Sequence, residues 1–202
     1  MNTKWSYWLM KDAIPKNDIA KIKRIAHEAG YSDANLRSNN RNGVFNEERR
    51  KTGVAFSSDP YLYDLFCPMI THANDSSGWN FDIDWYEGAQ IARYKKDQYY
   101  SWHKDGGSDN NGVYTEKTAP VANSHYIGKV RKLSLVGILS DSYDGGVFQI
   151  RGYLDDGEKI LEPDISIGDV VVFPSYLIHR SSVVTKGTKY SLAMWCLGPP
   201  FK

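Results

Sequence analysis

The sequence predicts a mainly β domain preceded by helices, an α+β chain whose core is a β-sandwich or barrel. Apolar residues recur at helical spacing through the first third of the 202-residue chain. From about Trp79 onward, apolar and polar residues alternate instead, as they do in half-buried strands. The content of 14 Tyr, 6 Trp and 7 Phe also favours β-structure, a pocket lined by aromatic rings, or both.

Two helices are expected in the first third of the chain. The first begins near Ile14–Asp18, carries its apolar residues on one face and ends at Gly30. The second begins at Ser58–Pro60, and Pro68 inside its apolar stripe is expected to kink or shorten it. The polar segment between the two helices, Tyr31–Lys51, is expected to be a loop.

The remainder is expected to form short strands separated by turns that contain glycine. The expected strands are Trp79–Trp85, Ala89–Tyr94, Tyr99–Lys104, Arg131–Leu139, Gly146–Gly152, Val170–Phe173 and Thr188–Leu197. The segment Gly106–Gly128 is rich in Gly, Asn, Ser and Thr, and its length is typical of a functional lid. We therefore expect one domain over residues 1–202, with a helical support region over 1–78 and a β-core over 79–198.

Composition and charge exclude several classes of protein. The formal net charge is +1, so a general nucleic-acid clamp and a nucleic-acid partner are not expected. No apolar run approaches the roughly 20 residues that a membrane helix needs, and no secretory signal is recognisable. Two cysteines are too few for a disulfide framework. A cytoplasmic location is expected, whereas the oligomeric state cannot be predicted.

The most informative pattern is a His-x-Asp pair, His103 and Asp105. Residues two apart on a strand point to the same face, so the imidazole and the carboxylate would project side by side. His179 can supply a third ligand from a distant strand. Two histidines and one carboxylate form the facial triad of non-haem Fe(II) oxygenases. A chance pair on the surface is the alternative, because His-x-Asp by itself is a weak signal.

A lysine lies ten residues after His179, on the strand that is expected next. On that strand Lys189, Ser191, Ala193 and Trp195 share one face. A buried lysine without a partner is costly, so an inward Lys189 implies an anionic ligand or a protein carboxylate. A solvated lysine on an edge strand is the alternative.

Four separated residues resemble the signature of 2-oxoglutarate/Fe(II)-dependent dioxygenases, in particular the prolyl 4-hydroxylase-like branch: His103, Asp105, His179 and Lys189. That family often carries a tyrosine nine residues before the first histidine and an aromatic residue three before it, as Tyr94 and Tyr100 are here. The segment Arg131–Asp141 is similar to a core strand of the family. The resemblance covers roughly Trp79–Leu197.

The resemblance implies a double-stranded β-helix, the jelly roll of cupin-like proteins, with iron near one open end. It implies that Fe(II) is bound by the catalytic residues His103, Asp105 and His179. It further implies that Lys189 pairs with the distal carboxylate of 2-oxoglutarate and that Tyr94 donates its hydroxyl to the same co-substrate. Ser191 is expected to assist there.

The reaction implied by the resemblance consumes 2-oxoglutarate and O2, releases succinate and CO2, and hydroxylates an unactivated C–H bond. Ascorbate is expected as a reductant. A prolyl residue in a peptide or protein partner is the substrate that the resemblance favours, with Tyr100, Arg151 and Trp195 expected to contact it. Strand alternation would turn Trp102 away from His103 unless a bulge intervenes.

Three other functions are compatible with the same residues. The chain could be a non-catalytic jelly-roll binding module, which would bind little 2-oxoglutarate in the presence of iron. It could be a dioxygenase that acts on a free amino acid or another small molecule. It could also be a hydrolytic or isomerising metal enzyme of the cupin type, which requires neither Lys189 nor Tyr94.

Overall fold

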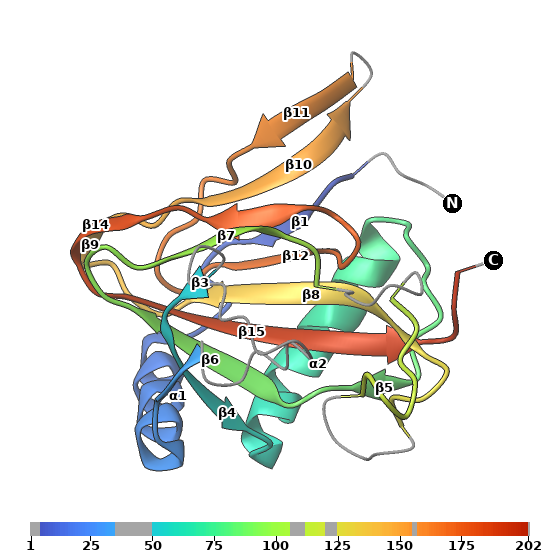
Figure 1. The fold of residues 1–202 in the computed structure, drawn as a ribbon, viewed down its shortest axis with the longest axis horizontal. Helices are drawn as coiled ribbons and strands as arrows, with labels where there is room; N and C mark the ends of the chain where they lie inside the picture. Colours follow the sequence, from blue (N-terminus) through green and yellow to red (C-terminus); the bar gives the residue numbers. More distant parts are fainter. Residues whose placement is uncertain (1–4, 35–49, 106–111, 120–124, 155–156, 202) are drawn as a thin grey trace.

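The computed structural model describes residues 5–34, 50–105, 112–119, 125–154 and 157–201. Within these residues there are two helices and fifteen strands (Figure 1). The helices are α1 (Lys16–Ala29) and α2 (Pro60–Ser76). Neither helix is long and apolar enough to cross a membrane.

An eight-stranded antiparallel sheet forms the larger layer. Its order is β1 (Trp8–Met10), β12 (Val170–Pro174), β8 (Val130–Ile138), β15 (Lys189–Gly198), β6 (Ala89–Tyr94), β4 (Gly53–Ser57) and β2 (Ser32–Asp33), and β5 (Trp85–Tyr86) pairs with β15. A five-stranded sheet forms the second layer, in the order β11 (Gly157–Leu161), β10 (Phe148–Leu154), β13 (His179–Ser181), β7 (Tyr99–His103) and β3 (Arg50–Lys51). A short ribbon of β14 (Val184–Gly187) and β9 (Tyr143–Gly145) joins them at one end.

The two helices pack against the outer face of the larger sheet (Figure 1). On β15, Leu192, Met194 and Cys196 are fully buried in the core shared with the helices. Side chains alternate along a strand, so the odd-numbered residues of β15, among them Lys189 and Trp195, face the second sheet. The chain is a mainly β jelly roll with helices on one side, which confirms the expected fold class.

Both expected helices form close to their predicted bounds. The carboxylate of Asp59 accepts a hydrogen bond from the Tyr61 backbone N–H at 3.0 Å, which caps the N-terminus of α2. Pro68 lies inside α2 without ending it, since the helix continues to Ser76.

The expected strand Trp79–Trp85 is wrong for most of its length. Trp79 and Phe81 are buried as the alternation predicts, but Asn80 between them has a positive φ of 50° and breaks the extended backbone. The side chain of Asn74 binds both the N–H and the carbonyl of Phe81, at 2.9 and 3.0 Å. A side chain thus supplies the bonds that a neighbouring strand would have made.

The expected loop Tyr31–Lys51 is wrong at both ends. Its first residues form β2, which pairs with β4, and its last residues form β3, which pairs with β7. Residues 35–49 lie outside the part of the chain that the structure describes. The expected lid, Gly106–Gly128, also falls partly outside it, at residues 106–111 and 120–124. The β10–β11 hairpin, whose second strand was not expected, projects from the body of the fold (Figure 1).

Candidate functional site

Three residues converge between the two sheets. His103 ends β7 and His179 begins β13, and the two are directly paired across the antiparallel ladder. Asp105 follows two residues beyond His103. Its Oδ1 lies 3.5 Å from His103 Nε2, and its Oδ2 lies 3.4 Å from His179 Nε2. The three side chains offer ligand atoms within 4.8 Å of one another, a spacing that can hold one metal ion.

Backbone carbonyls fix the orientation of both imidazoles. His103 Nδ1 lies 2.7 Å from the Ser101 carbonyl, and His179 Nδ1 lies 3.0 Å from the Leu177 carbonyl. A carbonyl can only accept, so each Nδ1 carries the proton. Each Nε2 therefore presents its lone pair to Asp105 and to the space between them, as a metal ligand requires.

The charges at the site suit a divalent cation. Burial by itself raises the pKa of the Asp105 carboxyl, but His179, His103 and Arg131 together hold that pKa well below its usual range. Burial lowers the pKa of His179 to about 4, although the Asp105 charge opposes this. The carboxylate is thus ionised and His179 neutral near pH 7, the forms in which both bind metals.

A second group of side chains holds Asp105 in place. Trp195 donates its Nε1–H to Asp105 Oδ2 at 2.8 Å. Arg131 donates to the Asp105 backbone carbonyl at 2.9 Å, while its Nε and Nη2 bind the two carboxylate oxygens of buried Glu87. The Tyr126 hydroxyl donates to the same carboxylate.

The pairing of Glu87 with Arg131 was not expected from the sequence. The only indication in the sequence was the presence of one acidic and one basic residue, because an inward-facing Arg needs a carboxylate partner. Strand periodicity could not reveal that Arg131 points inward, with 16% of its side chain exposed, since one inward charge at a strand end resembles a surface residue.

A pocket opens between the sheets at these residues. It is lined by the three candidate ligands together with Tyr94, Tyr100, Lys189, Ser191 and Trp195. Arg151 does not line it. Its guanidinium forms an ion pair with Glu158 at 3.6 Å and lies 5.0 Å from the ring of Trp102.

Lys189 is buried, with 2% of its surface exposed, and it lies on a central strand. It is therefore not a solvated lysine of an edge strand. Its Nζ donates to the Gly146 carbonyl at 2.6 Å and to Ser181 Oγ at 3.0 Å, and no carboxylate of the described residues pairs with it. Burial lowers the pKa of Lys189 to about 7. A lysine in this position can form an ion pair with a carboxylate of a bound ligand. The ligand would then supply the counter-charge that the protein does not provide.

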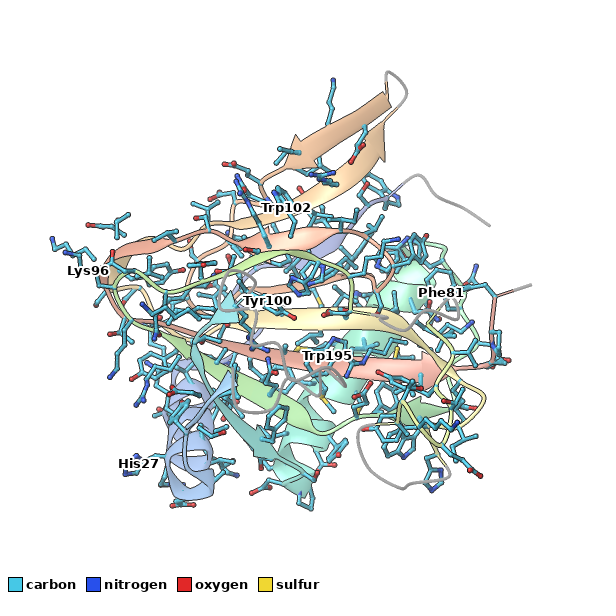
Figure 2. The ribbon with its side chains drawn as sticks, viewed as in Figure 1. His27, Phe81, Lys96, Tyr100, Trp102 and Trp195 are labelled. Atoms are coloured by element: carbon cyan, nitrogen blue, oxygen red, sulfur yellow. The ribbon has the colours of Figure 1, made fainter. Side chains whose placement is uncertain are left out.

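A bulge in β7 decides which aromatic residues face the pocket. His103 pairs with His179 but Tyr100, three residues earlier, pairs with Ser181, so the register shifts by one residue. Tyr100 consequently shares a face with His103, and their rings stack with centroids 3.4 Å apart. Trp102 turns away toward the base of the β10–β11 hairpin, whereas Tyr100 lies between the sheets (Figure 2).

Trp195→Phe is expected to weaken binding of a divalent metal by about tenfold. The change removes the N–H that orients Asp105 and keeps most of the ring, and losing such an outer partner typically costs 10- to 100-fold. Competition with a chromogenic chelator measures the affinity. The matched control is Trp102→Phe, on the other face of β7, which should leave it unchanged. Equal affinities for Trp195→Phe and the unmodified protein would contradict this role.

Residues 89–197 match the family described as the 2OG-Fe(II) oxygenase superfamily. Among solved structures, similar folds include a Pseudomonas putida prolyl-4-hydroxylase, with 19% identity, a TM-score of 0.63 and coverage of 95% of this chain and 91% of that one. The viral collagen prolyl hydroxylase of Paramecium bursaria Chlorella virus-1 has 16% identity, a TM-score of 0.62 and coverage of 98% and 99%.

A Trichoplax adhaerens prolyl hydroxylase, solved with a peptide fragment of the hypoxia inducible factor oxygen degradation domain, has 15% identity, a TM-score of 0.68 and coverage of 96% and 84%. A search of curated protein sequences finds no match. These structural likenesses show the fold. The family match spans more than half of the chain, and it implies a dioxygenase with Fe(II) as its metal cofactor and 2-oxoglutarate and O2 as co-substrates. The chain belongs to the 2OG-Fe(II) oxygenase superfamily.

Proposed function

We propose that this dioxygenase hydroxylates a prolyl residue in a peptide or protein, with succinate and CO2 as co-products. The observation that carries the proposal is one pocket in which His103, Asp105 and His179 converge beside the buried, carboxylate-free Lys189. A facial triad holds iron on one side only, and a buried lysine that no carboxylate of the described residues pairs with suits a dicarboxylate.

In this proposal His103, Asp105 and His179 hold Fe(II) and are the catalytic residues. Their donor set fits the ion, because two neutral imidazole nitrogens and one ionised oxygen face a common point. Bound Fe(II), with 2-oxoglutarate and O2, supplies an oxidant strong enough for an unactivated C–H bond. The protein orients the substrate and keeps competing water away.

The co-substrate is assigned to the polar end of the pocket. We assign the distal carboxylate of 2-oxoglutarate to Lys189, and hydrogen bonds from Tyr94 and Ser191 to the same molecule. Register supports this grouping: Tyr94 is paired with Lys189, and Ser191 follows two residues later on the same face. All three side chains line the pocket.

Binding of 2-oxoglutarate is expected to weaken above pH 7. Burial lowers the pKa of ligand-free Lys189 to about 7, and a bound carboxylate raises it. Below pH 7 the lysine is already charged, whereas above it binding must take up a proton, so affinity falls by up to about tenfold per pH unit. The rings of Tyr94 and Tyr143 also face Lys189, but burial raises the pKa of both above this range.

Calorimetric titration of the Mn(II)-loaded protein between pH 7 and 9 measures this dependence. Lys189→Arg keeps its charge throughout and is expected to flatten the profile. The same slope in Lys189→Arg and the unmodified protein would contradict the assignment of the carboxylate to Lys189.

The prolyl substrate is supported by the walls of the pocket. Beside the triad it is lined by Tyr100, Trp195, Val136, Phe148 and Ala193, which suit an apolar ring without a charge. The similar structures include prolyl hydroxylases, one of them solved with a peptide. Arg151, outside the pocket, could touch only a longer peptide that extends over the β10–β11 hairpin.

Three further assignments belong to the proposal. We assign ascorbate as the reductant that maintains Fe(II). A reducing, cytoplasmic location is supported by the free thiols of Cys67 and Cys196. We also assign one dioxygenase domain to residues 1–202, with 1–78 as the support region and 79–198 as the core.

The test is incubation of the Fe(II)-loaded protein with 2-oxoglutarate, O2 and a library of proline-containing peptides. Mass spectrometry should find one added oxygen atom on proline, with succinate formed in equal amount. Asp105→Ala provides the inactive control. Oxygen added only to a free amino acid or to another side chain would replace the prolyl assignment while leaving the dioxygenase intact.

A further inference from the structure

Arg50 is a partly buried cation that the assignments above do not use. It lies on β3 directly opposite Tyr100 of β7. Its guanidinium carbon is 4.4 Å from the centre of the Tyr100 ring. The imidazole of His103 stacks on the same ring, so it covers one face and Arg50 must cover the other. A continuous stack thus leads from a candidate iron ligand to the Arg50 guanidinium.

The nitrogens of Arg50 are mostly without acceptors. Its Nη1 donates to Gln90 Oε1 at 3.3 Å. Its Nε and Nη2 are buried and have no partner at hydrogen-bond distance. The guanidinium nevertheless lies near enough to the Tyr94 hydroxyl to oppose the rise that burial causes in the pKa of that hydroxyl. No carboxylate in the described part of the chain forms an ion pair with it. Buried guanidinium donors normally find an acceptor, because a buried N–H without one loses the hydrogen bond it made to water.

A second arginine of this chain shows which kind of ligand the unpaired donors of Arg50 can bind. In Arg131 the same two nitrogens, Nε and Nη2, bind both oxygens of the Glu87 carboxylate. This pair of parallel N–H groups matches the two oxygens of a carboxylate. Arg50 presents the same fork with nothing bound to it.

The position of Arg50 separates it from the co-substrate cation. Its partner Gln90 lies opposite Ala193, whereas Tyr94 lies opposite Lys189, four residues along the same two strands. At about 3.3 Å per residue, Gln90 and Lys189 are roughly 13 Å apart along the sheet. Gln90, Tyr94 and Tyr100 line the pocket; Arg50 is not itself a lining residue, but it contacts Gln90 and Tyr100. Two cations line the pocket, Lys189 and Arg180. Lys189 suffices for the co-substrate, and Arg180 donates its Nε to Gln149 and lies over the Trp102 ring. Arg50 adjoins the pocket with its Nε and Nη2 unpartnered.

We propose that Arg50 forms a second carboxylate subsite, and that the substrate carries a carboxylate close to the residue that is hydroxylated. The carboxylate is an Asp or Glu side chain of a peptide, or the terminal carboxylate of a short peptide or amino acid. This inference rests on the dioxygenase function proposed above, and it defines the substrate class of the same pocket.

Calorimetry on the Mn(II)-loaded protein, saturated with a non-reactive 2-oxoglutarate analogue, tests the subsite without turnover. The probes are blocked peptides in matched pairs. Acetyl-Ala-Pro-Glu-amide is compared with its Gln counterpart, acetyl-Ala-Pro with a free carboxylate is compared with its amide, and each pair is repeated with Ala in place of Pro. The Glu pair and the terminal pair distinguish the two sources of the carboxylate.

The carboxylate member of at least one pair is expected to bind at least about tenfold more tightly than its neutral counterpart. Arg50→Gln should abolish that preference and leave binding of the 2-oxoglutarate analogue unchanged. Arg93→Gln is the matched control. Arg93 also stacks on a tyrosine, Tyr31, at 4.4 Å and has a buried unpartnered Nε, but Tyr31 does not line the pocket, whereas Tyr100, on which Arg50 stacks, does.

Each outcome decides between the two proposals. Equal binding of carboxylate and neutral peptides, a preference that survives Arg50→Gln, or no binding of any probe overturns the subsite. An Arg50-dependent carboxylate preference that is the same for Pro and Ala peptides supports the subsite and overturns the prolyl assignment. If Arg50→Gln no longer bound the 2-oxoglutarate analogue, Arg50 would belong to the co-substrate site, and the inference would be overturned.

Discussion

His179→Ala is expected to abolish retention of Fe(II) and, with it, all consumption of 2-oxoglutarate. The change removes one of three ligands whose nitrogen and oxygen atoms lie within 4.8 Å of one another. The expected loss of Fe(II) affinity exceeds about 100-fold, the upper range for losing only an outer partner of a ligand. Equilibrium dialysis under anaerobic conditions, followed by iron determination, measures it.

His72→Ala is the matched control, because His72 binds Ser76 Oγ on the surface of α2. It should retain iron like the unmodified protein. Unchanged iron content in His179→Ala, with the fold intact by circular dichroism, would show that the metal is held elsewhere.

Lys189→Met is expected to eliminate measurable 2-oxoglutarate binding while iron binding persists. Truncating one partner of a buried charge pair typically costs about 2–5 kcal/mol, or 30-fold to several thousand-fold in affinity. The variant is also expected to melt at a higher temperature, because the ligand-free protein buries Lys189 without a carboxylate at 2% exposure. Calorimetry and thermal denaturation measure the two effects.

Lys132→Met is the matched control. Lys132 is also buried, at 3% exposure, but its Nζ lies 3.8 Å from the centre of the Phe201 ring and does not line the pocket. It should bind 2-oxoglutarate normally. A large loss in Lys132→Met, or none in Lys189→Met, would contradict the assigned position of the co-substrate. It would also favour a metal enzyme that needs no such lysine.

The residues that could be predicted from the sequence were those at short, fixed spacings. Two-residue alternation placed Lys189, Ser191 and Trp195 on one face of β15, and they do line the same pocket. The expected fold class and family are confirmed. The metal and co-substrate roles of the individual residues stay predictions, although the structure brings their side chains together.

Other features depend on contacts that no local pattern encodes. The one-residue register shift in β7 turns Tyr100 toward His103, and alternation alone could not place it. Trp79 and Phe81 alternate like a strand, but the Asn74 side chain and the positive φ of Asn80 produce a turn instead. The same limit applies to Arg50, because only the folded chain shows that its donors are buried and unpaired.

The visible spectrum of the Fe(II)-loaded protein, recorded without O2 before and after addition of 2-oxoglutarate, tests the central claim most directly. A new charge-transfer band, absent in His179→Ala, is the result expected when the co-substrate binds iron held by His103, Asp105 and His179. No band, with iron confirmed in the protein and the fold intact, would contradict the proposed iron centre and its co-substrate.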